Sequence, residues 1–153
     1  MSSWVLLAYR LPREPSTPRI AIWRQLRRLG ALQLADGLVA LPLDARTREQ
    51  LEWLADDVIE HDGEATIWVG QPGSASQERA LATRMASSVA ADYERIAVEA
   101  LTLAAAEPVP SRSLGRLRRE LRRTRARDYF PGPASGCAAA AVEALGRRLE
   151  AAS

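Results

Sequence analysis

The chain has 153 residues and a mass of 16.7 kDa, the size of one ordinary domain that can bury its own core. Hydrophobic residues make up 47% of it and it holds only nine Gly and nine Pro, which excludes a disordered or fibrous protein. The net charge of +2 hides a segregation of charges. Residues 112–127 are rich in Arg with Glu120 as their one acid, whereas residues 44–64 are rich in acids.

The sequence has too few cysteines and histidines for a disulfide-linked or zinc-binding domain, and its apolar runs are too short for a membrane span. A single cysteine, Cys137, excludes an internal disulfide, and a single histidine, His61, leaves no combination for a zinc site. No apolar run approaches the roughly 20 residues of a membrane span. The apolar start at residues 4–9 also lacks the basic segment that opens a signal peptide. We therefore expect a cytoplasmic protein that holds no metal and no other cofactor.

The first elements along the chain are a strand and a helix. Residues 3–10 are almost continuously apolar, which predicts a central strand covered on both faces. Thr17-Pro18 then predicts a helix start, with the helix running from residue 18 to residue 29. The helical period divides its side chains into an inward set, Ile22, Trp23, Leu26 and Leu29, and an outward set, Arg24, Arg27 and Arg28.

A hairpin, a second helix and a last strand follow. Asp36-Gly37 separates two short apolar runs, which is the signal for a hairpin with a type I′ turn. Asp44 and the capping-box pattern of residues 47–50 predict the start of a second helix, and Gly63 is expected just past its end. Residues 65–70 predict the fourth strand. The inward residues of this second helix are Leu51, Leu54, Ala55 and Val58.

The periodicity becomes helical in the second half of the chain. We predict a long helix from Ser74 to about Pro108, an Arg-rich helix over residues 113–128 and a last helix after Pro131-Gly132-Pro133. The shared face of the long helix holds Leu81, Met85, Val89, Tyr93, Ile96 and Leu103, and that of the last helix holds Val142, Leu145 and Leu149.

These elements predict an α+β fold in a single domain, residues 1–153. Strand, helix, hairpin, helix and strand give the βαββαβ order of a ferredoxin-like core, which we assign to residues 1–73. Residues 74–153 would be additional C-terminal helices, a helical extension packed on that core.

Candidate catalytic residues are scarce in this sequence. His61 lies in an acidic stretch at a helix end, where we interpret it as a C-terminal cap that suits the helix dipole. Cys137 adjoins the apolar run 138–141, which predicts a buried, inert thiol. No Gly-rich phosphate loop follows any predicted strand. We predict no catalytic residue and no enzymatic activity.

The Arg-rich helix is the most informative segment. Helical angles place Leu114, Leu117, Leu121 and Asp128 on one stripe and Arg116, Arg119, Arg123 and Arg127 on the opposite, water-facing stripe. Such a stripe is a solvated face, a surface for nucleic-acid phosphates or a site for a small oxyanion. Arg24, Arg27 and Arg28 form a second basic surface that we count among the candidate nucleic-acid-binding residues. Arg125 falls within the leucine stripe, so it must reach water or a carboxylate.

Two features point to contacts with another protein or subunit. Trp53 lies on the outer side of the second helix among acidic residues, which makes it a candidate interface residue, although single exposed apolar residues are ordinary. Two helices can cover only one face of a four-stranded sheet, so the C-terminal helices or a second subunit must cover the other face. We predict a homodimer.

Three segments carry a resemblance to the N-terminal domain of ChrB-type chromate-resistance regulators. They are residues 4–7 (WVLL), residues 19–31 (RIAIWRQLRRLGA) running into Leu41-Pro42, and residues 127–132 (RDYFPG). The resemblance implies a regulator of chromate-resistance genes whose basic N-terminal part is a candidate DNA-binding unit. The chain also resembles, more faintly, the ferredoxin-like part of PaaX-type repressors and small CRISPR-associated nucleases. Those nucleases keep an acidic metal ligand at the end of the first strand, where this chain has Arg10, so nuclease activity is not implied.

Three functional hypotheses follow. The first is a transcriptional regulator, or a regulator domain, that binds DNA through its Arg-rich surface. The second is a binding module that responds to an oxyanion such as chromate or sulfate, and the third is a structural dimerisation module without DNA binding. Affinity for DNA that falls steeply with salt would support the first, and thermal stabilisation by chromate or sulfate would support the second. The third predicts neither result.

Overall fold

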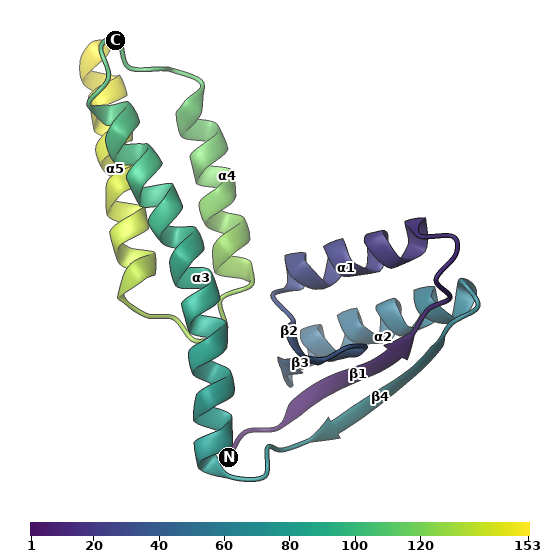
Figure 1. The fold of residues 1–153 in the computed structure, drawn as a ribbon. Coiled ribbons are helices and arrows are strands. Elements are labelled where there is room, and N and C mark those ends of the chain that lie inside the picture. Colours follow the sequence, from purple (N-terminus) through teal and green to yellow (C-terminus); the bar gives the residue numbers. More distant parts are fainter. The chain divides into compact units, whose positions relative to one another are not determined.

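A computed structural model describes all residues from Met1 to Ser153. Contacts divide the chain into two compact units, Met1–Ala82 and Thr83–Ser153, and each is described by itself. The first unit holds four strands and two helices, and the second unit is helical (Figure 1). The long helix α3, Ala75–Ala104, begins in the first unit and ends in the second. The predicted α+β class is confirmed.

The four strands form one antiparallel sheet in the order β2-β3-β1-β4. Their bounds are β1 Trp4–Arg10, β2 Leu32–Ala35, β3 Leu38–Pro42 and β4 Glu64–Gly70. Leu6 of β1 stands between Ala40 of β3 and Trp68 of β4, so β1 is a central strand as its apolar sequence predicted.

Two helices lie on the same side of the sheet, α1 at Thr17–Leu29 and α2 at Ala45–Glu60 (Figure 1). Side chains alternate along a strand, so every second residue of β1 belongs to the face between sheet and helices. Val5 and Leu7 are fully buried there. All four predicted inward residues of α2 are buried, as are two of the four predicted for α1: Leu51, Leu54, Ala55, Val58, Ile22 and Leu26.

Trp23 does not point inward, and that prediction is wrong. The residue is 51% exposed, and the Cζ atom of Arg27 lies 5.0 Å from the centroid of its ring. A guanidinium over an aromatic face is attracted by the ring quadrupole, and this contact takes the place of burial for one side of the indole.

The start of α2 is fixed by a reciprocal pair of hydrogen bonds. Asp44 Oδ1 accepts from the Thr47 backbone N–H at 2.7 Å, and Thr47 Oγ1 accepts from the Asp44 backbone N–H at 2.9 Å. The capping box is therefore present, but it uses residues 44 and 47 where the sequence pattern suggested 47–50. Burial of the Thr47 side chain explains why this pair, closer to β3, is the one that forms.

The end of α2 departs from the prediction in one respect. His61 is the C-cap, as predicted, and its ring Nδ1 lies 2.8 Å from the carbonyl oxygen of Asp57. The left-handed residue that closes the helix is Asp62, at φ 64°, rather than Gly63. Glycine is needed at 63 for space, because a Cβ there would lie 2.5 Å from the carbonyl oxygen of Arg10.

The hairpin turn is not of type I′, which would need a positive φ at both central residues. Only Gly37 has one, at φ 71°, whereas Asp36 does not. The pairing of β2 with β3 also shifts register between Gln33 and Ala35, so the hairpin is irregular next to its turn. The Gly37 carbonyl oxygen accepts the Tyr9 backbone N–H at 2.8 Å, which ties the turn to β1.

Gly37→Ala should lower the free energy of unfolding by more than about 1 kcal/mol. A residue with a side chain is strained at this positive φ, and its Cβ would lie 2.3 Å from the carbonyl oxygen of Tyr9. Gly70→Ala is the matched control, because a Cβ there meets nothing within 4 Å. Chemical denaturation followed by circular dichroism compares the two variants, and equal losses would contradict the role assigned to the turn.

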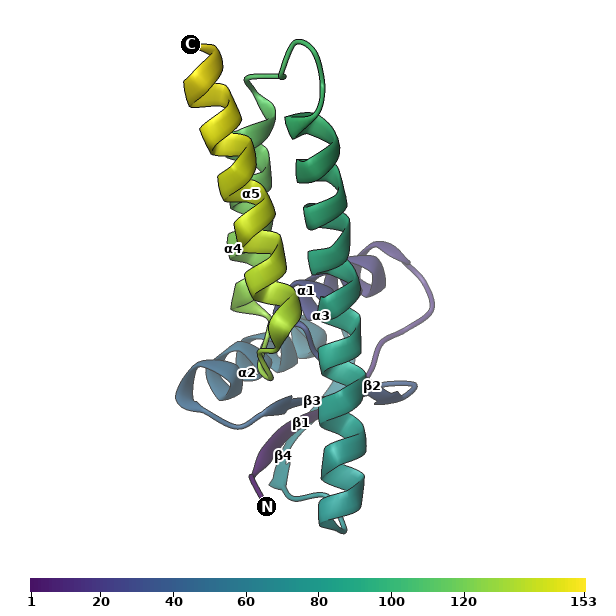
Figure 2. The same ribbon diagram turned by 90° about the vertical axis from the view of Figure 1, so that its left-hand side faces the viewer.

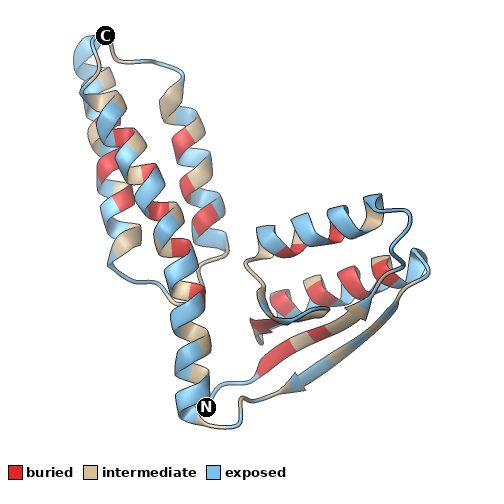
Figure 3. Ribbon diagram, in the orientation of Figure 1, coloured by how far each residue is buried: buried red, intermediate tan, exposed pale blue.

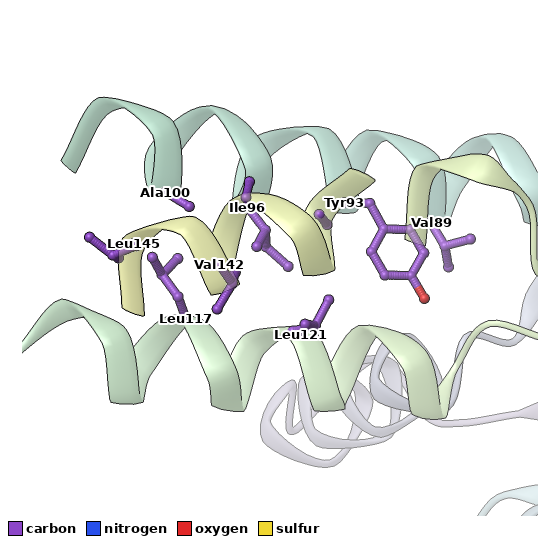
Figure 4. Close-up of a cluster of buried hydrophobic side chains, with 10 residues drawn as sticks. Val89, Tyr93, Ile96, Ala100, Leu117, Leu121, Val142 and Leu145 are labelled. Atoms are coloured by element: carbon purple, nitrogen blue, oxygen red, sulfur yellow. The ribbon is translucent and has the colours of Figure 1, made fainter. Parts of the chain in front are cut away.

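The second unit consists of three helices that run side by side: the later part of α3, α4 at Ser113–Ala126 and α5 at Pro133–Ala152 (Figures 1 and 2). Buried residues line the sides on which the helices face one another (Figure 3). Tyr93 and Ile96 of α3, Leu117 and Leu121 of α4, and Leu145 of α5 meet in one core (Figure 4). The inward positions predicted for this part of α3 are confirmed, except that Leu103 is only partly buried.

Cys137 is exposed, so the prediction of a buried thiol is wrong. The apolar stripe of α5 runs through Ala138, Ala141 and Leu145, and position 137 lies at its edge, about 40° from Ala141 and about 100° from Ala138. The run of alanines made the flanking residues look equally apolar, so the sequence did not show which side of α5 faces the core. A membrane span would need a longer or more apolar helix than any in this chain.

Candidate nucleic-acid interface

Helix α4 has one buried side and one exposed side (Figure 3), and most residues of the exposed side are arginines. Leu117, Leu121 and Thr124 are buried, and Leu114 is partly buried against the same core, which confirms the predicted leucine stripe. Packing of this leucine side against α3 and α5 holds the helix, because most helical stability in proteins comes from the packing of an apolar side.

Arg116, predicted to face water, is held between two carboxylates. Its guanidinium pairs with Glu99 of α3 and, at 3.1 Å, with Glu120 one turn further along α4. Hydrogen bonds that Arg116 donates to Glu99 and, with a smaller effect, to Glu120 raise the pKa of Arg116 above its ordinary value. The charge of this arginine is therefore compensated within the fold.

Arg127 is held in a similar way at the other end of α4. Its Nη2 lies 2.9 Å from Asp92 Oδ2 of α3 and 3.2 Å from the Thr124 hydroxyl, and its side chain is only 22% exposed. The Thr124 hydroxyl in turn donates to the carbonyl oxygen of Glu120 at 2.9 Å. Arg116 and Arg127 thus join α4 to α3, and the predicted stripe of four arginines is divided.

The other two members of the stripe, Arg119 and Arg123, are exposed and form no ion pair. Arg118 and Arg122 are also exposed and unpaired, and the sequence prediction missed them. We call these residues, Arg118, Arg119, Arg122 and Arg123, the α4 arginine surface. The sequence of α3 contains the residues that decide which arginines are paired. Asp92 and Glu99 are two helical turns apart, so they lie on the same side of α3 and can pair with the arginines at the edge of α4.

Arg125 and the three arginines of α1 are also exposed. Arg125 reaches solvent beside the core, and its Nε lies 3.4 Å from the Ser135 hydroxyl, so it finds no carboxylate. Arg24, Arg27 and Arg28 project from α1 as predicted, and they belong to the first unit, whereas α4 belongs to the second.

Trp53 of α2 is 61% exposed. It lines a shallow groove of about 350 Å³ with residues of α1 and α2, among them Gln25, Arg28 and Asp57. The exposed ring agrees with its predicted position on the outer side of the helix, and its role as an interface residue stays a prediction.

Tyr93 anchors the segment that follows α4. The ring is buried in the core, and its hydroxyl donates to Asp128 Oδ2 at 2.9 Å (Figure 4 shows the ring). Burial raises the pKa of Tyr93, while a hydrogen bond with Ser135 lowers it and the hydrogen bond with Asp128 raises it further. The other carboxylate oxygen of Asp128 is buried without a partner, so this hydrogen bond is the one that satisfies the side chain.

Tyr93→Phe should lower the free energy of unfolding by about 1–3 kcal/mol at pH 7, because it leaves the Asp128 carboxylate without its donor. The pH dependence that the Tyr93 hydroxyl gives to the free energy of unfolding should disappear as well. The pKa of Tyr93 is higher in the folded than in the unfolded protein, so its contribution is complete below about pH 10 and is lost as the pH rises further. Urea denaturation at pH 7, 9 and 11 measures both effects. A variant that loses stability above pH 10 as steeply as the parent would contradict this account.

Comparison with known proteins agrees with the resemblance seen in the sequence. The family described as "Protein ChrB, N-terminal" matches residues 19–153. Protein ChrB of Cupriavidus metallidurans is 36% identical over 77 residues, which cover 50% of this chain and 24% of that protein. The match therefore spans about a quarter of that relative's length. No solved structure matches the chain significantly. Because the family match covers nearly the whole chain, the protein belongs to the ChrB N-terminal family.

Proposed function

We propose that the chain is the DNA-binding part of a chromate-resistance-type transcriptional regulator. Membership of the ChrB N-terminal family supports a regulator, and the α4 arginine surface supports DNA as its ligand. The observation that carries the proposal is that four neighbouring arginines of α4 lack an acidic partner, whereas Arg116 and Arg127 are paired with carboxylates.

The arrangement of these arginines suits phosphates better than a single small anion. Arg118 and Arg123 are five residues apart, which spaces them about 7.5 Å along the helix axis, and the side chains diverge around it. Duplex DNA offers a continuous row of charges, one per about 1.7 Å of its axis, so several arginines can each meet a phosphate. A lone oxyanion would need the guanidinium groups to converge.

Salt dependence of DNA binding tests the proposal. Four phosphate contacts give a slope of about −3.6 in log affinity against log salt, so raising salt from 50 to 200 mM should weaken binding about 150-fold. The measurement is a mobility-shift titration with DNA from upstream of chromate-resistance genes. No binding at 50 mM salt would contradict the proposal. Thermal stabilisation by chromate or sulfate in the absence of DNA binding would favour the oxyanion-responsive module instead.

Nuclease activity is not part of the proposed function. Arg10, at the end of β1 where the resembling nucleases keep an acidic ligand, pairs with Glu64 at 3.1 Å. A guanidinium at this position repels a divalent cation. Incubation with single- and double-stranded DNA and Mg²⁺ or Mn²⁺ should leave the substrates intact, and EDTA-sensitive cleavage that survives repurification would show otherwise.

We propose that the regulator acts as a homodimer. The sheet face opposite α1 and α2 carries an apolar groove of about 410 Å³, lined by Trp4, Leu6, Leu38 and Trp68, and Trp68 is 60% exposed. The beginning of α3 covers one end, where Glu78 accepts a hydrogen bond from the Trp4 indole N–H at 3.2 Å. Light scattering at high micromolar concentration should give a dimer mass, and Trp68→Glu should shift it to the monomer.

The first unit is proposed to be ferredoxin-like. Its order of strands and helices and the common side of α1 and α2 support this. An experimental structure whose strands pair in a different order from β2-β3-β1-β4 would contradict it.

A further inference from the structure

A cavity of the first unit lies where β1 ends, α1 begins and the β2–β3 turn approaches them. Its volume is about 690 Å³, and small-molecule sites typically occupy about 300–1,000 Å³. The residues that matter for its chemistry are Tyr9, Arg10, Arg19, Ile20, Trp23 and Asp36. Every one of them belongs to Met1–Ala82, so the cavity is complete within one unit.

Aromatic and apolar side chains form part of the cavity wall. Trp23 and Ile20 are both about half exposed, at 51% and 47%. The Arg27 guanidinium lies over one face of the Trp23 indole, and this contact favours the orientation that the ring has in the free protein. A solvent-exposed aromatic ring can stack on another flat ring. Such stacking removes from water apolar surface that stays exposed in the free protein, which favours binding.

The cationic groups of the cavity differ in how far they are already paired. Arg10 is bound to Glu64 at 3.1 Å, whereas Arg19 forms no ion pair. Arg19 lies close enough to Tyr9 to lower the pKa of its hydroxyl, although burial, the larger effect, raises that pKa. The Arg19 guanidinium is therefore at the cavity and available to a phosphate or carboxylate, which it can bind through two parallel hydrogen bonds.

We propose that this cavity binds a small planar anion, whose ring stacks on Trp23 and whose phosphate or carboxylate group pairs with Arg19. A nucleoside monophosphate and an aromatic carboxylic acid both have this chemistry, and the experiment distinguishes them. The site uses no residue of α4, so ligand binding in this cavity can be tested independently of DNA binding through the α4 arginine surface.

The indole signals of the full chain give a direct measurement. The protein has four tryptophans, so a ¹⁵N-labelled sample gives four side-chain signals, and Trp23→Phe identifies that of Trp23. Adenosine monophosphate and 2-naphthoate are titrated separately, with adenosine and inorganic phosphate as ligands that carry only half of the recognised chemistry. We expect a saturable shift of the Trp23 signal with adenosine monophosphate, with 2-naphthoate or with both. If adenosine monophosphate binds, adenosine alone and inorganic phosphate alone should each bind at least about tenfold more weakly.

Substitutions then separate the site from general surface charge. Arg19→Gln should raise the dissociation constant about 10- to 100-fold, as expected for a lost hydrogen bond to a charged group. Arg24→Gln is the matched control, because Arg24 is exposed on the same helix but does not line the cavity. An unchanged amide spectrum shows that each variant is folded.

Several outcomes would overturn the proposal. One is that neither adenosine monophosphate nor naphthoate shifts the Trp23 signal at millimolar concentration. Another is that Arg24→Gln weakens binding as much as Arg19→Gln, which would indicate screening by net charge. A shift confined to the signals of Trp53 or Trp68 would place the binding elsewhere on the protein.

Discussion

Replacing Arg118, Arg119, Arg122 and Arg123 by Gln should lower the affinity for duplex DNA at least about 100-fold at 0.1 M salt. Each arginine that meets a phosphate releases a condensed counterion, so the loss should be similar for all DNA sequences and the salt slope should shrink by about one per lost contact. The fold should persist, because exposed substitutions usually cost within about 0.5 kcal/mol each. Mobility-shift titrations at several salt concentrations measure both the affinity and the slope.

Two control variants make this experiment specific. Arg24, Arg27 and Arg28 changed together to Gln remove a comparable exposed charge from α1, in the other unit. Arg116→Gln removes a paired charge from α4 itself, and it should lower stability while leaving the salt slope nearly unchanged. DNA binding with the parent's affinity and slope after the fourfold substitution would reduce the α4 arginine surface to a solvated face. A loss confined to the α1 variant would move the interface to the first unit.

Leu117→Ala should lower the free energy of unfolding by about 2–5 kcal/mol. Leu117 is fully buried in the core with Ile96 of α3 and with Val142 and Leu145 of α5, so truncation removes apolar contacts from all three helices and leaves a cavity (Figure 4). Chemical denaturation, with hydrogen exchange of the amides of α3, α4 and α5, measures the loss and shows where it falls.

Leu101→Ala is the matched control for the core substitution. Leu101 lies on α3 one residue beyond the fully buried Ala100, yet it is 57% exposed. The same change there should cost less than about 0.5 kcal/mol. A similar loss for the two variants would mean that Leu117 does not lie in the packed interior of the second unit.

The sequence predicted the structure correctly where the position of a residue depends on the pattern within a single helix or strand. The central position of β1, the inward side of α2 and the leucine stripe of α4 all follow from the spacing of apolar residues within one segment. Those patterns are local, because a strand repeats every two residues and a helix every 3.6. Family membership was likewise predictable from short motifs.

The errors occurred where a residue's environment depends on a distant or unusual partner. Arg116 and Arg127 look like free cations until Glu99 and Asp92 of α3 are placed beside them. Trp23 looks like a core residue by its spacing, but Arg27 holds its ring at the surface. The sequence identified the helix and two of the four residues of the α4 arginine surface, and their role in DNA binding stays a prediction.

The carboxylates of α3 also affect the affinity of this protein for a polyanion. Glu99 and Asp92 act as counterions built into the fold, bound to α4 before any external ligand arrives. The effective valence of the helix is therefore lower than its number of arginines, and it is set by residues that a DNA strand need not touch. Gain or loss of one acidic residue on α3 is thus a way to tune affinity without altering the contact surface.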